Sequence, residues 1–271
     1  MSIHITAVIH PNAKIAKDVS IGPYSVIGEH VALGNRCVVG AHCVLEGRTT
    51  IGTDNHFYTG AAIGGIPQDL KYVKGEPSFL EIGNHNNFRE YVTVNTGTAE
   101  GGATTRIGNH VHIMAYTHIA HNCLIEDGVI IANGGTLGGH VHIGERAILG
   151  GLAGIHQFVR VGRLAIVGAV SKAVQDVIPF ATVDGHPARV YGLNRIGLKR
   201  AGISPETQQD LKLALRLLFR SGFSREKAMQ EIRTECGQSL EVKELLEFIA
   251  RSKRGICSRV RGREKEIAWN D

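Results

Sequence analysis

The sequence predicts a mainly β fold, a solenoid of short strands followed by a smaller C-terminal α-helical domain. Three observations predict it. Apolar residues recur at every sixth position through most of the chain, and glycine is abundant, with 34 residues out of 271. After Pro179 the six-residue rhythm ends and apolar residues follow at helical spacing instead. Aromatic residues make up only 6% of the chain, so we expect a core of Ile, Val, Leu and Ala.

The six-residue repeat extends over two long blocks. The first runs from Ile9 to Ile63 and the second from Ile107 to Val167, with no polar residue at the repeating position. An α-helix advances about 1.7 turns in six residues, so it cannot present this pattern on one face. Short strands joined by tight turns can, with the apolar residue inward and three hexads closing a coil of about 18 residues. This pattern resembles the left-handed parallel β-helix of hexapeptide-repeat proteins.

Glycine often follows the repeating apolar residue, as at Gly22, Gly34 and Gly144. We expect glycine there because the bend of the coil requires an unusual φ. Two stretches interrupt the repeat, residues 65–78 and 95–105, and we predict that both are loops that leave the coil. A solenoid tolerates such insertions at its corners, and loops of this kind often carry binding residues.

The C-terminal part carries three helix signals. Ser204 precedes a proline and a glutamate, which is typical of a helix N-cap, and the helix is expected to end at Gly222. Residues 224–236 and 239–252 are predicted to form two more helices. The predicted organisation is a β-helix domain over 1–190, a helical domain over 191–258 and a mobile tail over 259–271.

Charge and cysteine content bound the functional class. The formal net charge is +5, with arginine and lysine concentrated toward the C-terminus, which suits nucleic acid, an anionic membrane surface, or an acidic partner or substrate. Five cysteines without a C-x-x-C pair favour a reducing, cytosolic compartment over a disulfide framework. We expect neither a secretory signal nor a membrane span.

The second block is rich in histidine. His118 and His121 share one segment, His140 follows about one coil later, and His156 about one coil after that. A ladder of imidazoles would suit general-base chemistry near neutral pH. A zinc site of three histidines, as in hexapeptide-repeat carbonic anhydrases, fits the same spacing, because spacing alone cannot place ligands at one point. A third interpretation is a non-catalytic scaffold whose histidines are ordinary polar surface residues.

Several motifs make the resemblance more specific. They are PQDLKY with a following GEP (Gln68–Tyr72, Gly75–Pro77), HIAHNC (His118–Cys123), GGHV (Gly138–Val141), HQF (His156–Phe158) and GLKRAG (Gly197–Gly202). With these motifs in this order, the chain resembles the UDP-N-acetylglucosamine O-acyltransferase family up to about residue 255. The resemblance implies a cytoplasmic homotrimer that needs no cofactor or metal. It implies transfer of a (3-hydroxy)acyl chain from acyl carrier protein to the 3-position of UDP-N-acetylglucosamine, the first step of lipid A biosynthesis.

The resemblance also implies residue roles. His121 matches the general base, and the backbone N–H of Gly139 matches the group that stabilises the oxyanion. Ala169 matches the position associated with acyl-chain length. Many relatives carry Asp where this chain has Asn122, and an amide can orient an imidazole but cannot stabilise its charge. The implied substrate-contacting residues are Gln68, Asp69, Lys71, His118, Asn122, His140, His156, Gln157, Asn194 and Arg200.

Three points stay open at the level of sequence. The acceptor can be the 3-hydroxyl or a 3-amino sugar nucleotide, and the acyl length is undetermined. The related N-acyltransferase of the same pathway carries an N-terminal uridine-binding domain, whereas the hexads here begin by Ile9. The basic C-terminal surface is expected to dock the acidic acyl carrier protein, and neither nucleic acid nor stable membrane insertion is expected.

Overall fold

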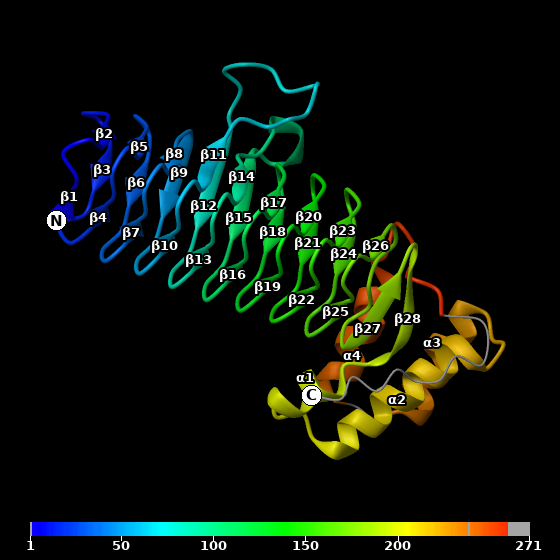
Figure 1. Ribbon diagram of the computed structural model, residues 1–271. Coiled ribbons are helices and arrows are strands. Elements are labelled where there is room, and N and C mark those ends of the chain that lie inside the picture. Colours follow the sequence, from blue (N-terminus) through cyan, green and yellow to red (C-terminus); the bar gives the residue numbers. More distant parts are fainter. Residues whose placement is uncertain (1, 238, 260–271) are drawn as a thin grey trace.

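The repeating apolar residue ends a short strand in each hexad, and the strands stack into a prism. The computed structural model describes residues 2–237 and 239–259, apart from the side chain of Arg220. In that part of the chain the strands form three sheets of 11, 9 and 8 strands. Figure 1 shows the coils stacked in chain order from the N-terminus, with the helices gathered at the far end of the prism.

Each sheet takes every third strand. The first sheet contains β1 (Ser2–Ile3), β4 (Ser20–Ile21), β7 (Val38–Val39), β10 (His56–Phe57), β13 (Asn87–Phe88), β16 (His112–Ile113), β19 (Ile130–Ile131), β22 (Ile148–Leu149), β25 (Ile166–Val167), β27 (Ala181–Gly185) and β28 (Ala188–Leu193). The second contains β2 (Val8–Ile9), β5 (Val26–Ile27), β8 (Val44–Leu45), β11 (Ala62–Gly65), β14 (Thr93–Asn95), β17 (His118–Ile119), β20 (Thr136–Leu137), β23 (Gly154–Ile155) and β26 (Lys172–Ala173). The third contains β3 (Lys14–Ile15), β6 (Ala32–Leu33), β9 (Arg48–Ile51), β12 (Phe79–Ile82), β15 (Thr104–Ile107), β18 (Leu124–Ile125), β21 (His142–Ile143) and β24 (Arg160–Val161).

The register confirms three hexads per coil. Ser20 pairs with Val38 in a parallel arrangement, one eighteen-residue coil apart. The spacing widens where His56 pairs with Asn87 and where Asn87 pairs with His112, because the loops at 65–78 and 95–105 add residues there without disturbing the stack. The predicted parallel β-helix is therefore confirmed.

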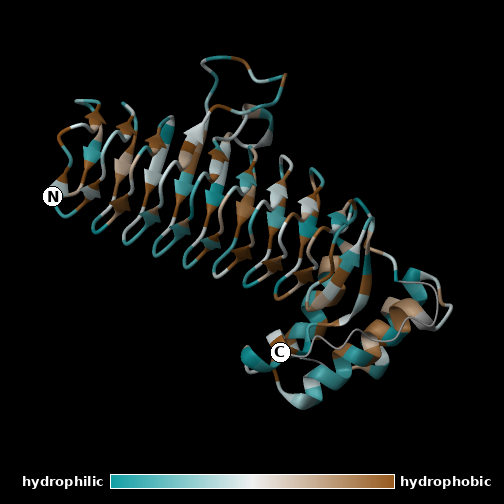
Figure 2. Cartoon of the chain, viewed as in Figure 1, coloured by the Kyte–Doolittle hydropathy of each residue, from teal (hydrophilic) through white to brown (hydrophobic). Residues whose placement is uncertain are grey.

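The core is a column of inward apolar side chains. From Ile21 onward the repeating residues are buried, and most belong to the aliphatic set expected from composition. Phe57 and Phe88 are exceptions that lie on successive coils, fully buried, with ring centroids 4.8 Å apart and nearly parallel planes. The two rings fit inside the prism because they come from neighbouring coils and stack on each other. Figure 2 shows hydrophobic and hydrophilic stretches alternating around each coil.

The expected reason for the repeat glycines is wrong. Gly22, Gly34 and Gly144 do not adopt a positive φ. The left-handed residue of a hexad lies three positions after the apolar one and is usually not glycine, as at Tyr24 (φ 56°) and Arg36 (φ 55°). Glycine follows the apolar residue because coils stack closely there: a Cβ on Gly144 would lie 2.6 Å from the backbone nitrogen of the next coil.

The prism ends in an antiparallel hairpin, β27 with β28, which leads into the helices. These are α1 (Arg195–Arg200), α2 (Pro205–Arg220), α3 (Arg225–Glu235) and α4 (Leu240–Ala250). Ser204, Ser224 and Ser239 cap α2, α3 and α4, each accepting a hydrogen bond from the backbone N–H of the third residue of its helix, and the cap at Ser204 was predicted from sequence. Helix α1 was not predicted, and β28 extends past residue 190 to Leu193.

Buried Asp176 ties the chain end back to the prism. Its carboxylate accepts hydrogen bonds from the backbone N–H of Arg160 and the hydroxyl of Ser252, and its backbone bridges to Ile256. Arg259, the first residue of the predicted tail, bridges to Val190. Residues 260–271 of that tail lie outside the described residues. Among the helices that are described, none has the length and apolar character needed to cross a membrane.

Candidate active site

Both inserted loops lie at the corner that follows the second sheet. In Figure 1 the long loop after β11 and the shorter loop after β14 leave the prism on the same side. The shorter loop contains a one-turn 3-10 helix, η1 (Ala99–Gly101). The loops contact each other, since the Ser78 hydroxyl donates to Thr96 Oγ1 at 2.6 Å and the Ala99 N–H donates to a Glu76 carboxylate oxygen. The histidine turns of the following coils come next in the same stack.

His121 lies at the centre of this corner. Its side chain is only 12% exposed, and its Nδ1 is 2.8 Å from Asn122 Oδ1. Its Nε2 faces Asp69 from the long loop, with 3.8 Å between Nε2 and Oδ2. The ring stands against Gly139 of the next coil, where a Cβ would lie 2.5 Å from Nε2. Glycine at 139 therefore makes room for the imidazole.

The backbone N–H of Gly139 has no hydrogen-bond partner within the described part of the chain. At some equivalent turn positions of the third sheet a side chain of a neighbouring coil accepts this hydrogen bond: the Asn109 N–H donates to Asp127 at 2.7 Å and the Glu145 N–H to Glu126 at 2.8 Å. The carbonyl of the same Gly138–Gly139 peptide accepts from the buried Cys123 thiol at 3.3 Å. The peptide is thus anchored on one side and presents a free donor beside His121.

His118 and His140 flank the central imidazole. Burial lowers the pKa of His118, with a further contribution from His121, and its Nδ1 is 2.7 Å from the Thr93 hydroxyl. Burial, followed by His121, also lowers the pKa of His140. The His121 and His140 rings meet edge to face with centroids 5.1 Å apart. Both flanking histidines are therefore biased toward the neutral form.

The predicted ladder of histidines does not continue to His156. The ring that stacks on His140 is that of Phe158, with centroids 4.5 Å apart. His156 is exposed and its Nδ1 lies 3.1 Å from the carbonyl oxygen of Gln157, which is itself exposed. The reason is register: His140 and Phe158 are eighteen residues apart, whereas His156 is two positions short of that spacing.

The remaining predicted residues occupy three other places. Gln68 and Lys71 are exposed on the long loop beside Asp69. Asn194 is only 4% exposed and caps α1, accepting from the Gly197 N–H and donating to the Leu164 carbonyl. Arg200 is exposed on α1, and Ala169 is exposed at a different corner of the prism, after β25. Within one chain the structure thus gathers six of the predicted residues at the histidine corner: Asp69, His118, His121, Asn122, Gly139 and His140.

Three contacts of this corner were not predicted. Thr93 contacts His118, Phe158 stacks on His140, and Thr98 binds Asn122. Asn122 and His140 both lie three positions after an apolar residue, as does Phe158, so the hexad count could have found that ring. Thr98 belongs to an insertion outside the repeat, and no periodicity could place it.

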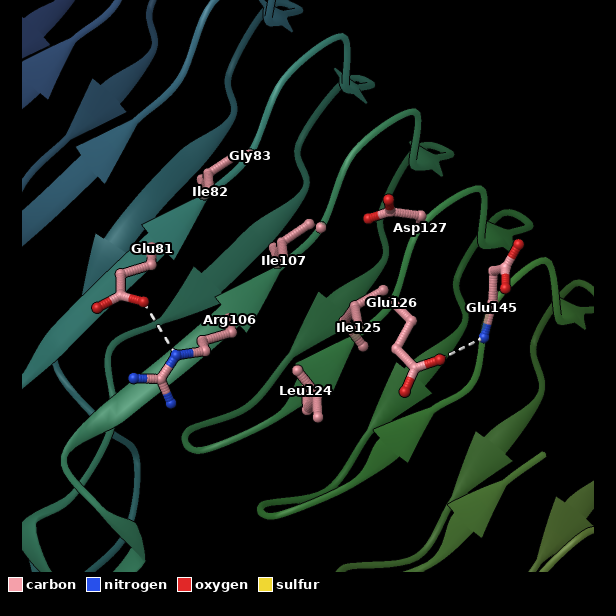
Figure 3. A pocket seen from close by; sticks show the side chains of 11 residues that line it. Glu81, Ile82, Gly83, Arg106, Ile107, Leu124, Ile125, Glu126, Asp127 and Glu145 are labelled. Atoms are coloured by element: carbon pink, nitrogen blue, oxygen red, sulfur yellow. Dashed lines mark hydrogen bonds and ion pairs between the residues drawn. The ribbon is translucent and has the colours of Figure 1, made fainter. Parts of the chain in front are cut away.

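A separate cavity of about 600 Å³ lies on the outer face of the third sheet. Figure 3 shows Glu81, Arg106, Leu124 and Glu126 among its lining residues. Two of its carboxylates have close partners, since Arg106 donates to Glu81 at 2.9 Å and Glu126 lies 2.6 Å from His142. None of the predicted site residues lines it. Among the described residues, no group of three or more His, Cys, Asp or Glu is arranged to hold a metal ion.

The fold and the site together define a hexapeptide-repeat acyltransferase with a helical C-terminal domain. Residues 104–139 match the family model "Bacterial transferase hexapeptide (six repeats)", and residues 176–257 match "UDP N-acetylglucosamine O-acyltransferase; Domain 2". The curated acyl-(acyl-carrier-protein)–UDP-N-acetylglucosamine O-acyltransferase of Thiobacillus denitrificans is 49% identical over 255 residues, covering 94% of this chain and 98% of that protein.

Solved structures agree. The UDP-N-acetylglucosamine O-acyltransferase of Moraxella catarrhalis is 40% identical with a TM-score of 0.90, covering 94% of this chain and 99% of that one. The UDP-N-acetylglucosamine acyltransferase of Campylobacter jejuni is 36% identical with a TM-score of 0.89, covering 96% and 100%. The chain belongs to the UDP-N-acetylglucosamine O-acyltransferase family, and it is an acyltransferase.

Proposed function

We propose that the protein transfers a (3-hydroxy)acyl chain from acyl carrier protein to the 3-hydroxyl of UDP-N-acetylglucosamine, the first step of lipid A biosynthesis. The donor and acceptor are those in the names of its relatives. The observation that carries the proposal is the arrangement at His121: Nδ1 is held by Asn122, while Nε2 faces Asp69 beside the unpartnered N–H of Gly139.

In this mechanism His121 Nε2 takes the proton of the sugar 3-hydroxyl as its oxygen attacks the thioester carbonyl carbon. The carbonyl oxygen becomes an oxyanion and accepts a hydrogen bond from the Gly139 N–H. A single donor of this kind contributes about 3–4 kcal/mol to transition-state stabilisation. The C–S bond then breaks, and the leaving thiolate receives the proton from Nε2. Asp69 supplies the negative charge beside the transient imidazolium that Asn122 cannot supply.

The other matched residues are proposed to hold the substrates. Gln68, Lys71, His156 and Gln157 are exposed, so their polar groups are free to contact the sugar nucleotide or the pantetheine arm. Exposed Arg200 suits a diphosphate, because a guanidinium binds phosphate oxygens in a bidentate manner. Asn194, whose amide is used within the chain, would act by setting the start of α1.

We also propose a left-handed winding and a homotrimer in the cytoplasm, with acyl carrier protein docking on the basic C-terminal surface. The trimer is supported by an exposed apolar ridge at the corner after the first sheet. Leu152 is 68% exposed and Val170 is 65% exposed, although both adopt a positive φ. A branched residue in that conformation carries strain. Contact of these apolar side chains with water adds a second free-energy cost, which burial against another subunit would remove.

The assay uses a pool of acyl carrier proteins with different acyl chains, offered with UDP-N-acetylglucosamine or its 3-amino analogue, and mass spectrometry of the product. We expect an ester at the 3-position and loss of product in His121→Ala. The control His30→Ala, which changes an exposed histidine on an earlier coil, should keep full activity. An amide formed only on the amino analogue would revise the acceptor. If the purified protein held stoichiometric zinc and lost its activity when the zinc was removed, the proposed acyl transfer would be replaced by a zinc-dependent hydratase activity.

Ala169 and the oligomeric state have separate measurements. If Ala169 limits the acyl groove, Ala169→Gly should shift the product pool toward longer chains, by about one or two carbons for one methyl group removed. Light scattering should give three times the chain mass of 29.2 kDa. A charge placed in the ridge by Leu152→Glu should lower that mass. A monomer mass for both the wild type and the variant would contradict the trimer.

A further inference from the structure

The orientation of His121 depends on a residue outside the repeat. Asn122 adopts a positive φ of 58°, which asparagine tolerates, and its backbone N–H donates to the buried Thr105 hydroxyl at 2.8 Å. Its side chain faces Thr98 near the start of the same loop. The two ends of the 95–105 insertion therefore grip Asn122 from its backbone and from its side chain.

Thr98 determines which end of the Asn122 amide is the oxygen. Asn122 Oδ1 accepts from the Thr98 backbone N–H at 2.9 Å and from the Thr98 hydroxyl at 2.8 Å. Asn122 Nδ2 donates to the Thr98 carbonyl at 3.1 Å. A flipped amide would place its NH2 group against the Thr98 N–H and its oxygen against the Thr98 carbonyl. This two-way contact leaves one amide orientation.

That orientation in turn assigns the histidine tautomer. Asn122 Oδ1 can only accept, so His121 Nδ1, 2.8 Å away, carries the hydrogen in the neutral ring. Nε2 is then unprotonated and faces Asp69 and Gly139, where the proposed mechanism needs a base. Thr98 occupies the N-cap position of η1, but its hydroxyl makes no capping hydrogen bond to that helix.

We propose that Thr98 is a positioning residue for acyl transfer: acting through Asn122, it holds His121 in the Nδ1–H tautomer with Nε2 free. The proposal rests on the proposed role of His121 as base. Thr98 itself is only 6% exposed, and its hydroxyl is hydrogen-bonded to Asn122, which in turn contacts His121. The insertion at 95–105 thus orients the base through an uncharged amide.

The test compares Thr98→Val, which removes the hydroxyl at nearly constant volume, with Thr98→Ser, which keeps it. One such hydrogen bond corresponds to a fall in kcat of about 3- to 10-fold. We expect that fall in Thr98→Val, with KM unchanged and a shifted acid limb of the pH–rate profile, and rescue in Thr98→Ser. Thr96→Val is the matched control, since Thr96 is a buried threonine of the same loop that bonds Ser78 and Gly65 instead of Asn122.

A second readout does not depend on turnover. In protein with ¹⁵N-labelled histidine, the His121 nitrogens should report the Nδ1–H form in the wild type and in Thr98→Ser. In Thr98→Val a measurably smaller fraction should be in that form, because the two backbone contacts of Thr98 remain but the hydroxyl contact is lost. Wild-type kcat and tautomer in Thr98→Val would overturn the proposal, as would an equal loss in Thr96→Val or in Thr98→Ser. Full activity of His121→Ala would instead refute the proposed function, so the two failures are distinguishable.

Discussion

The imidazole of His121 occupies the space that a side chain at residue 139 would take. A Cβ on Gly139 would lie 2.5 Å from both Cε1 and Nε2 of the ring. The two residues belong to successive coils, and the His140 N–H donates to the His121 carbonyl at 3.0 Å to keep those coils in register. The base and the free N–H are therefore placed by the stacking of the coils.

The first prediction follows from this contact. Gly139→Ala should lower kcat by about 100-fold or more, because the new methyl group displaces the imidazole from beside the oxyanion donor. The fold should survive, since Gly139 does not have a positive φ. Steady-state kinetics and thermal unfolding measure the two effects separately.

Gly192→Ala is the control for that experiment, because a Cβ at Gly192 would have nothing within 4 Å. It should retain wild-type kinetics and unfolding. If Gly139→Ala also retained wild-type kcat, the position of the His121 ring against this turn would not matter for catalysis.

The second prediction concerns the stacking glycines. Gly144→Ala should reduce the free energy of unfolding by about 1–3 kcal/mol, because its Cβ would meet the backbone of the next coil. Gly151→Ala should change it by no more than about 0.5 kcal/mol, since the nearest atom would be 3.5 Å away. Urea unfolding at one protein concentration compares the two, and equal losses would argue against close coil packing as the reason for the repeat glycines.

The third prediction concerns the stacked phenylalanines. Phe57→Ala should cost roughly 3–5 kcal/mol of the free energy of unfolding, because it leaves a cavity beneath Phe88 in the prism. Phe223→Ala, at an exposed position before α3, should cost much less. Denaturant titration gives both values, and a loss at Phe57 no larger than at Phe223 would contradict the packing described.

The fourth prediction concerns pH. The pKa values of His118 and His140 lie below the ordinary value of 6.5 in the folded protein, chiefly because both side chains are partly buried. Below pH 6.5 the unfolded chain therefore binds more protons than the folded one. The free energy of unfolding falls as the pH drops below 6.5, and no such loss occurs at higher pH. Urea unfolding between pH 5 and 8 should show this slope. The double variant with His118→Gln and His140→Gln should reduce it, while His56, whose pKa burial also lowers, retains part of it. A free energy of unfolding that rises toward pH 5 would refute the assignment.

The repeat and its consequences were predictable from sequence. Each coil contacts only its neighbours, so the inward apolar residue, the three-hexad coil and the loops at 65–78 and 95–105 follow from counting. The serine caps were predictable for the same local reason. The role of the glycines was predicted incorrectly, because a sequence shows where glycine recurs and not which backbone lies above it.

The sequence by itself therefore determined the β-helix, the helical domain and the coil that carries the histidines. The nineteen-residue spacing of His121 and His140 places the two rings at different turn positions of successive coils. Only the tertiary structure decided that these rings meet edge to face, with centroids 5.1 Å apart. The contact between Thr98 and Asn122 crosses from an irregular insertion to the repeat, where no period operates. Periodic packing is encoded locally, whereas the orientation of the base depends on hydrogen bonds that only the folded loops bring together.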